Sequence, residues 1–147
     1  MRGAGTAVAP FRPRLSNGAQ VMSKSPGHQQ HPDHRVAERH LDQRMTVSIN
    51  GEVIADSRDV IRVDEDKSPT RFYFPRSDVK MDKLQSSDKT SVCPFKGTAR
   101  YFSISAGGKQ LQDSVWSYET PYDEHADLAG RVAFYDDKMP DIQVRPG

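Results

Sequence analysis

The chain has 147 residues, with 21 Lys and Arg against 20 Asp and Glu and therefore a net charge of +1. Its hydrophobic fraction of 35% is low for a globular protein, so we expect part of the chain to stay outside the packed core. The single cysteine excludes an intramolecular disulfide and a four-cysteine zinc site. No run approaches the ~18 apolar residues of a membrane span. These properties predict one domain without a membrane segment, in a reducing, cytoplasmic setting.

Charge and apolar content divide the chain unevenly. Residues 1–45 contain seven Lys and Arg against three Asp and Glu, a net charge of +4, and few large apolar groups. The remaining residues contain fourteen against seventeen, a net charge of −3. A nucleic-acid surface needs clustered positive charge, which this weakly acidic body lacks. We therefore expect a β-rich domain over residues 46–147 and no nucleic-acid partner.

The N-terminal region is predicted to have two parts. Residues 1–22 are predicted to form a disordered tail, and Met22 would serve as a start site as well as Met1. Residues 23–45 are predicted to form a flexible, histidine-rich arm. Within this arm, Pro32 and Asp33 can start a short helix over residues 35–44, although its apolar stripe is thin.

The first half of the body predicts two strand pairs. Val47 and Ile49 alternate with polar residues before Asn50-Gly51, which is a strong two-residue hairpin signal, and residues 52–55 form the return strand. A second pair is predicted from residues 60–63 and 71–74, with the turn at residues 67–70 between them. Residues 78–84 then predict one or two helical turns capped by Asp78.

The second half predicts a long hairpin and two short strands. Residues 99–105 and 110–118 form the arms of the hairpin around a turn at residues 106–109. A short helix is predicted over residues 121–128 and ends at Gly130. Residues 132–135 and 141–144 are then expected to pair with each other.

Together these elements predict a mainly β protein, a small antiparallel β fold with one or two short helices. Three blocks of sequence add to this reading, and in chain order they are residues 74–79 (FPRSDV), 90–102 (TSVCPFKGTARYF) and 115–119 (VWSYE). These blocks resemble the family of domain of unknown function 427, which carries a nucleotidyltransferase label. The resemblance spans about Val47 to Val144 and implies a β-tent-like fold.

The central block contains the candidate catalytic residues Cys93 and Lys96. A thiol acts as a nucleophile only as thiolate, and Lys96, three residues further on, could supply the cation that favours this form. Cys93 could equally be a buried structural residue. Lys96 could pair with a phosphate or carboxylate, and Gly97 would let a ligand approach the backbone, or would form a turn with positive φ.

The two flanking blocks supply candidate ligand-binding residues. Arg76 offers a planar fork for an anion, and Asp78 could position that guanidinium or act only as a helix cap. Aromatic side chains at alternate strand positions are expected to line a pocket with a polar rim, or to belong to the core. They are Tyr73, Tyr101, Trp116 and Tyr118. Because Pro75 and Pro94 both stop strand pairing, Lys96, Arg76 and Tyr118 are expected to converge on one concave surface.

The histidines of the arm raise the alternative of a metal site. His28, His31 and His34 recur at every third residue, and imidazole is a ligand for zinc and nickel. Pro32 interrupts any helix that would align them, and no cysteine pair supports them. We therefore expect no structural metal.

The sequence favours a pocket for a small anionic ligand near Cys93 and Lys96, and leaves open whether this pocket only binds or also catalyses. The first alternative is a nucleotidyltransferase, as the family label suggests. That chemistry commonly needs paired carboxylates that hold a metal ion, and the run Asp64-Glu65-Asp66 lies in an expected turn. The second alternative is a protein partner bound by the N-terminal arm. The cofactor and the oligomeric state stay open.

Overall fold

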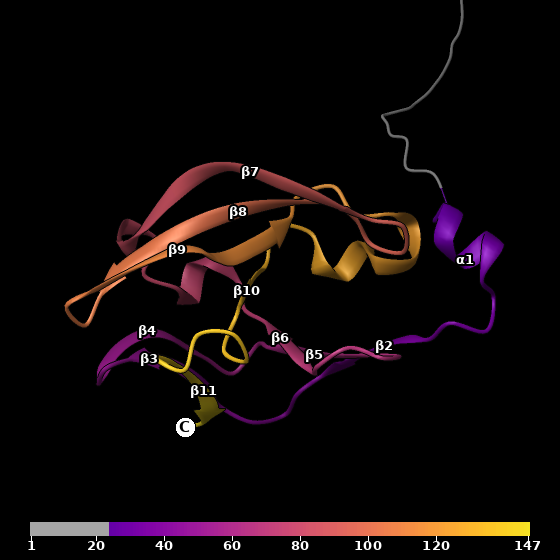
Figure 1. Cartoon of the computed structure of the whole chain (residues 1–147). Coiled ribbons are helices and arrows are strands. Elements are labelled where there is room, and N and C mark those ends of the chain that lie inside the picture. Colours follow the sequence, from indigo (N-terminus) through magenta and orange to yellow (C-terminus); the bar gives the residue numbers. More distant parts are fainter. Residues whose placement is uncertain (1–23) are drawn as a thin grey trace, which may run out of the picture.

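A computed structural model describes residues 24–147, and within this range the chain folds into three antiparallel sheets. Figure 1 shows a larger sheet above and two smaller sheets below it, with the short helix α1 at one end. The mainly β, antiparallel prediction is confirmed. The predicted disorder of residues 1–22 and the alternative start at Met22 lie outside the described residues.

The larger sheet has four strands in the order β10-β9-β8-β7. They are β7 (Leu84–Cys93), β8 (Gly97–Ala106), β9 (Lys109–Tyr118) and β10 (Val132–Phe134). The β8–β9 hairpin is the one expected from the sequence, with Ala106 opposite Lys109 at its turn. The strand β7 was not expected, because its central residues are Ser, Asp, Lys and Thr. Its position explains this composition, since charged and polar side chains are common on edge strands, where they discourage aggregation.

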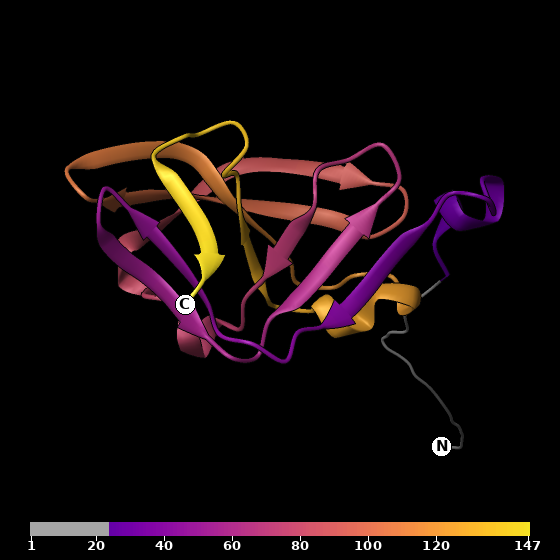
Figure 2. The ribbon, with the colours of Figure 1, turned by 90° about the horizontal axis from the view of Figure 1, so that it is seen from below.

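The two smaller sheets lie side by side in the view from below (Figure 2). One has the order β11-β3-β4 and the other the order β2-β5-β6. The first contains β3 (Met45–Ile49), β4 (Glu52–Ser57) and β11 (Ile142–Pro146). The second contains β2 (Val36–His40), β5 (Ile61–Glu65) and β6 (Arg71–Tyr73).

The helices are short and lie outside the sheets. In the described part of the chain, one α-helix, α1 (Pro26–Gln30), is followed by three 3-10 helices: η1 (Arg76–Asp78), η2 (Met81–Lys83) and η3 (Asp123–Leu128). The predicted helical turns at residues 78–84 are therefore only partly formed. The prediction that Asp78 caps them is wrong, because its carboxylate accepts a hydrogen bond from Ser57 Oγ at 2.6 Å.

Two other predicted elements are wrong. Residues 36–40 pair with β5 as the strand β2 and do not form a helix, since pairing offers their backbone a partner that the thin apolar stripe of a helix could not replace. Residues 142–146 pair with β3 and not with β10, so that Ile142 and Val144 lie opposite Ile49 and Val47.

The core fills the space between the layers as two adjoining clusters. In one cluster, residues of β3 and β4 pack against the larger sheet, and it includes Val47, Ile49, Ile54, Phe102, Ile104 and Val115. The other lies between β5–β6 and the larger sheet, and it includes Ile61, Val63, Tyr73, Tyr101, Trp116 and Tyr118. Full burial of each large apolar side chain stabilises the fold by roughly 1.5–3 kcal/mol. The layers therefore cohere mainly through apolar contacts.

A short bridge also joins the layers directly. Phe74, just after β6, exchanges two backbone hydrogen bonds with Val132 of β10, at 2.8 and 2.9 Å. This contact ties the β2-β5-β6 sheet to the edge of the larger sheet. Arg71 and Tyr73 come just before this bridge, and their side chains line a pocket between the two sheets.

Candidate functional site

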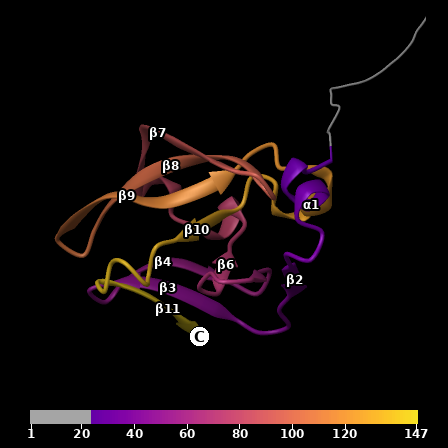
Figure 3. The ribbon, with the colours of Figure 1, turned by 45° about the vertical axis from the view of Figure 1, so that its right-hand side comes forward.

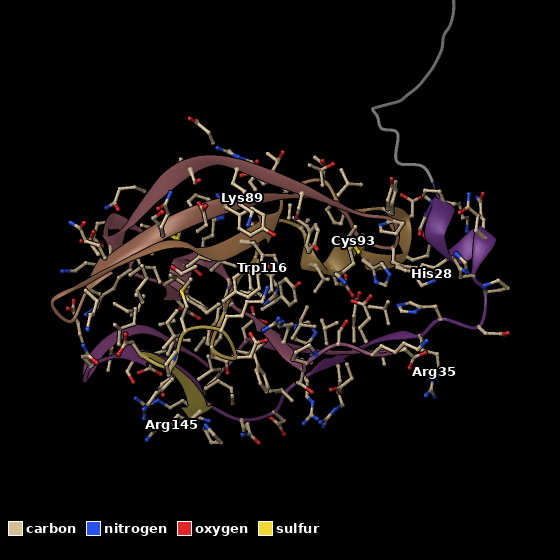
Figure 4. All side chains as sticks on the ribbon, viewed as in Figure 1. His28, Arg35, Lys89, Cys93, Trp116 and Arg145 are labelled. Carbon is tan, nitrogen blue, oxygen red and sulfur yellow. The ribbon has the colours of Figure 1, made fainter. Side chains whose placement is uncertain are left out.

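The pocket has a volume of about 340 Å³ and lies between the β2-β5-β6 sheet and the larger sheet. Successive side chains of a strand point to opposite faces, so residues two apart share a face. This alternation brings side chains from five strands to the same space, namely Val63, Glu65, Arg71, Tyr73, Ser91, Cys93, Tyr101, Trp116 and Tyr118. Figure 4 labels Cys93 and Trp116, which lie between the layers.

Aromatic side chains form one wall of the pocket and hold one another in place. Trp116 Nε1 donates a hydrogen bond to the hydroxyl of Tyr73 at 3.1 Å, and the two rings meet edge to face. Tyr101 shares hydrogen bonds with Ser91 at 2.9 Å and with Tyr135 at 3.3 Å. These contacts keep the wall rigid, because each ring is fixed by packing and by a polar contact.

A buried ion pair lies at another side of the pocket. The Lys96 ammonium, whose side chain is only 7% exposed, contacts Glu65 Oε1. The other carboxylate oxygen of Glu65 lies 2.9 Å from His34 Nε2, and the His34 ring stacks on Phe95 with 4.0 Å between centroids. Burial raises the pKa of Glu65, but the contacts with Lys96 and His34 outweigh this and bring it below its ordinary value. Glu65 is therefore ionised at neutral pH.

Tyr118 lines the same pocket, and its hydroxyl has no hydrogen-bond partner among residues 24–147. Its side chain is largely buried, and the residue is only 6% exposed. The Lys96 ammonium lies 5.8 Å from the centre of the Tyr118 ring. Burial strongly raises the pKa of Tyr118, so the hydroxyl stays neutral and remains a donor.

Arg71 forms a second cationic group of the pocket. Its guanidinium lies 5.0 Å from the centre of the Trp116 ring and 5.1 Å from that of Tyr135. A hydrogen bond of 2.7 Å to Asp137 neutralises it. Burial, with Tyr101 nearby, raises the pKa of Tyr135 to about 12, so Tyr135 also remains protonated.

The structure brings six of the nine predicted site residues to this pocket. They are Cys93, Lys96, Tyr73, Tyr101, Trp116 and Tyr118. The Cys93 thiol is free and the residue is partly exposed.

The predicted convergence of Arg76 with Lys96 is wrong. Arg76 donates to the backbone oxygen of Gly130 at 2.7 Å, to Ser117 Oγ at 3.1 Å and to Glu119 at 3.0 Å. Ser117 is one residue away from both Trp116 and Tyr118, so it points to the opposite face of β9. Asp78 is also outside the pocket, because it bonds Ser57.

Gly97 does not line the pocket but shapes the loop beside it. Its φ of +125° is a conformation that side chains disfavour, and a Cβ atom there would meet the backbone of Pro121 at 3.4 Å. Of the two readings of Gly97, the geometry fits the turn with positive φ. This turn carries the chain from Lys96 into β8.

Sequence reasoning missed three pocket residues, Glu65, Arg71 and Tyr135, and also His34, which contacts Glu65. Glu65 follows Val63 by two positions and Arg71 precedes Tyr73 by two, so strand alternation was a usable signal for both. The neighbours of Glu65 face elsewhere: Asp64 bonds Thr70 and Arg62, and Asp66 contacts Arg35. The three carboxylates of this run therefore do not converge.

The arm histidines also separate. His28 contacts His125, His34 contacts Glu65, and the ring of His31 lies 6.5 Å from that of Phe95. Among residues 24–147, no group of three or more His, Cys, Asp or Glu side chains has the geometry to hold a metal ion. No helix within that range is long and apolar enough to cross a membrane.

Most of the chain matches one protein family. Residues 37–145 match the family described as Domain of unknown function (DUF427). The chain belongs to this family. The match confirms the resemblance seen in the three sequence blocks, and it covers every residue that lines the pocket. No curated protein matches the chain.

Proposed function

We propose that this DUF427 protein binds a small ligand with an anionic group in the pocket between Lys96 and Tyr118. The observation that carries the proposal is a pair of donors, on the largely buried residues Lys96 and Tyr118, beside an open volume. An ammonium has three N–H donors, and within residues 24–147 Lys96 uses one of them, on Glu65. The Tyr118 hydroxyl uses none. Both residues line the pocket, so a ligand oxygen there would accept from the donors that they leave free.

The surrounding charges limit what this ligand can be. Glu65 already neutralises Lys96, and Asp137 neutralises Arg71. A multiply charged anion would be repelled by Glu65, whereas a single carboxylate or a singly charged phosphate ester would bond Lys96 and Tyr118 at lower cost. The tyrosine and tryptophan wall would then pack against an apolar or planar remainder. Chemistry beyond binding would fall to Cys93, whose thiol lines the same pocket.

Titration with benzoate, inorganic phosphate and citrate tests this proposal, with amide chemical shifts as the readout. We expect benzoate to shift resonances around Lys96, Tyr118 and Ser91, and trivalent citrate to bind at least tenfold more weakly. Lys96→Met and Tyr118→Phe should each weaken benzoate binding at least tenfold, because each removes a donor. The loss of one hydrogen bond of about 1.5 kcal/mol in each variant corresponds to such a change.

The control variant is Lys109→Met, which removes the same charge from an exposed residue at the far end of β9. It should bind benzoate as the unmodified protein does. Binding that survives in both Lys96→Met and Tyr118→Phe, with both variants folded, would show that the donors are not the site.

A further inference from the structure

The N-terminal helix α1 is docked onto a loop of the pocket. Gly27 donates its backbone N–H to the oxygen of Pro94 at 2.8 Å, and Ser25 Oγ donates to the same oxygen at 2.7 Å. Figure 3 shows α1 beside the segment that contains η3. Pro94 and Lys96 both line the pocket. Docking of α1 therefore supports the loop that carries the central lysine.

A row of three titratable side chains forms the second attachment between α1 and the rest of the protein. His28 Nε2 lies 2.9 Å from His125 Nε2, and His125 Nδ1 contacts a carboxylate oxygen of Glu38. His125 is only 3% exposed, whereas His28 is partly exposed. The three groups come from α1, η3 and β2, so they connect the helix to two elements of the body.

The number of protons on these three side chains decides whether the attachment of α1 holds. Glu38 accepts from His125 Nδ1, so that nitrogen carries a hydrogen. Between the two Nε2 atoms there is room for one proton, which either ring can supply as donor to the other. When both rings are fully protonated, each Nε2 carries a hydrogen and each ring carries a positive charge. The hydrogen bond would then become a repulsive contact.

The groups around His28 set the pH at which this happens. Burial first, and then the neighbouring His125, lower the pKa of His28, while Glu124 and Glu65 oppose this and His34 adds to it. The pKa of His28 in the docked state is thus below its ordinary value of 6.5. A group with a lowered pKa contributes its full stability above the ordinary value and loses it as the pH falls through the lowered one.

We propose that the His28–His125 pair is a pH-operated latch that holds α1 on the pocket loop above about pH 6.5 and releases it in mild acid. Release removes the contacts of Ser25 and Gly27 with Pro94, so the loop between Cys93 and Lys96 loosens. The consequence for ligand affinity rests on the function proposed above, whereas the latch itself does not. Histidine is suited to this role because its charge changes between pH 5 and 8.

Backbone amide exchange of the full chain between pH 8 and pH 5, corrected for intrinsic exchange rates, tests the latch without any ligand. Two amides report docking: Gly27, which bonds Pro94, and Ser25, which bonds Glu124 at 3.0 Å. We expect the protection of both to fall at least tenfold between pH 7.5 and pH 5. In His28→Gln, whose amide can donate but does not titrate, protection should stay constant over this range.

His40→Gln is the matched control, because His40 also contacts the side chain of another residue, Asp59, but is exposed and lies away from α1. It should keep the fall in protection. Constant protection in the unmodified chain, or an undiminished fall in His28→Gln, would overturn the latch. If benzoate fails to bind while these amides behave as expected, the pocket proposal fails and the latch stands.

Discussion

At the scale of single residues, the site depends on how each polar group near the core is satisfied. Tyr73 is 1% exposed, and its hydroxyl is the acceptor for the indole N–H of Trp116. Lys96 has an ionised partner but spare donors, and Tyr118 has no partner among residues 24–147. The Tyr73–Trp116 hydrogen bond satisfies the indole N–H and stabilises the aromatic wall. Lys96 and Tyr118 keep donors that are free to bond a ligand, which is why we assign the ligand to them.

Tyr73→Phe should lower the free energy of unfolding by about 1–3 kcal/mol, because it leaves the buried N–H of Trp116 without an acceptor. Urea denaturation followed by Trp116 fluorescence measures this change. Tyr122→Phe removes a hydroxyl from a partly exposed residue and should change the free energy by less than about 0.5 kcal/mol. Equal effects of the two substitutions would mean that the Tyr73–Trp116 bond does not stabilise the wall.

At the scale of elements, the sequence predicted local pairings better than distant ones. Asn50-Gly51 and Gly107-Gly108 both mark hairpins whose strands are adjacent in sequence, and both hairpins are present. The partner of β11 could not be found in this way, because β3 lies about 95 residues away and many apolar strands would have satisfied Ile142 equally well. The strand β2 was mistaken for a helix for a related reason, since only pairing with β5 decides its conformation.

The candidate site was predictable to the same extent. The alternating aromatics could be assigned because they lie on strands read correctly from local pattern, whereas Cys93 and Lys96 were singled out by the sequence block that resembles the family. Arg76 was misplaced because its face depends on Gly130 and Glu119, far along the chain. His34 was missed because nothing local shows that it will reach Glu65 across 31 positions.

Gly27→Ala should undock α1 at any pH, because its Cβ atom would lie 2.6 Å from the backbone oxygen of Pro94, which cannot move aside. An isolated helix of this length is not stable in water, so the released segment should lose its structure. We expect the Ser25 amide to lose at least tenfold in protection at pH 7.5. Gln29→Ala, on an exposed residue of the same helix, should leave it unchanged. A protected Ser25 amide in Gly27→Ala would contradict the docking contact.

At the scale of the whole molecule, ion pairs at the surface connect separate segments of the chain. Asp59 pairs with Arg131, Asp56 with Arg44, and Asp137 with Arg71. Hydrogen bonds from these arginines hold the pKa of each carboxyl below its ordinary value of 3.8. Each exposed pair contributes little to stability, but the pKa values of the three carboxyls all shift in the same direction.

Stability should therefore be nearly constant from pH 8 to about pH 5, apart from the contribution of His28, and should fall in stronger acid. Carboxyls with a lowered pKa contribute stability above their unfolded values, and lose it as the pH falls through the folded ones. The urea midpoint measured from pH 8 to pH 3 tests this, and high salt should flatten the fall because it screens exposed pairs. A midpoint unchanged at pH 3 would show that these pairs do not couple to folding.

The most direct measurement of the central claim is a crystal structure of the protein with benzoate at saturating concentration. The account predicts a carboxylate in the pocket, with one oxygen within hydrogen-bond distance of Lys96 Nζ and of Tyr118 Oη, and a ring against the aromatic wall. A pocket without benzoate, or benzoate held elsewhere without contact to Lys96 or Tyr118, would contradict it.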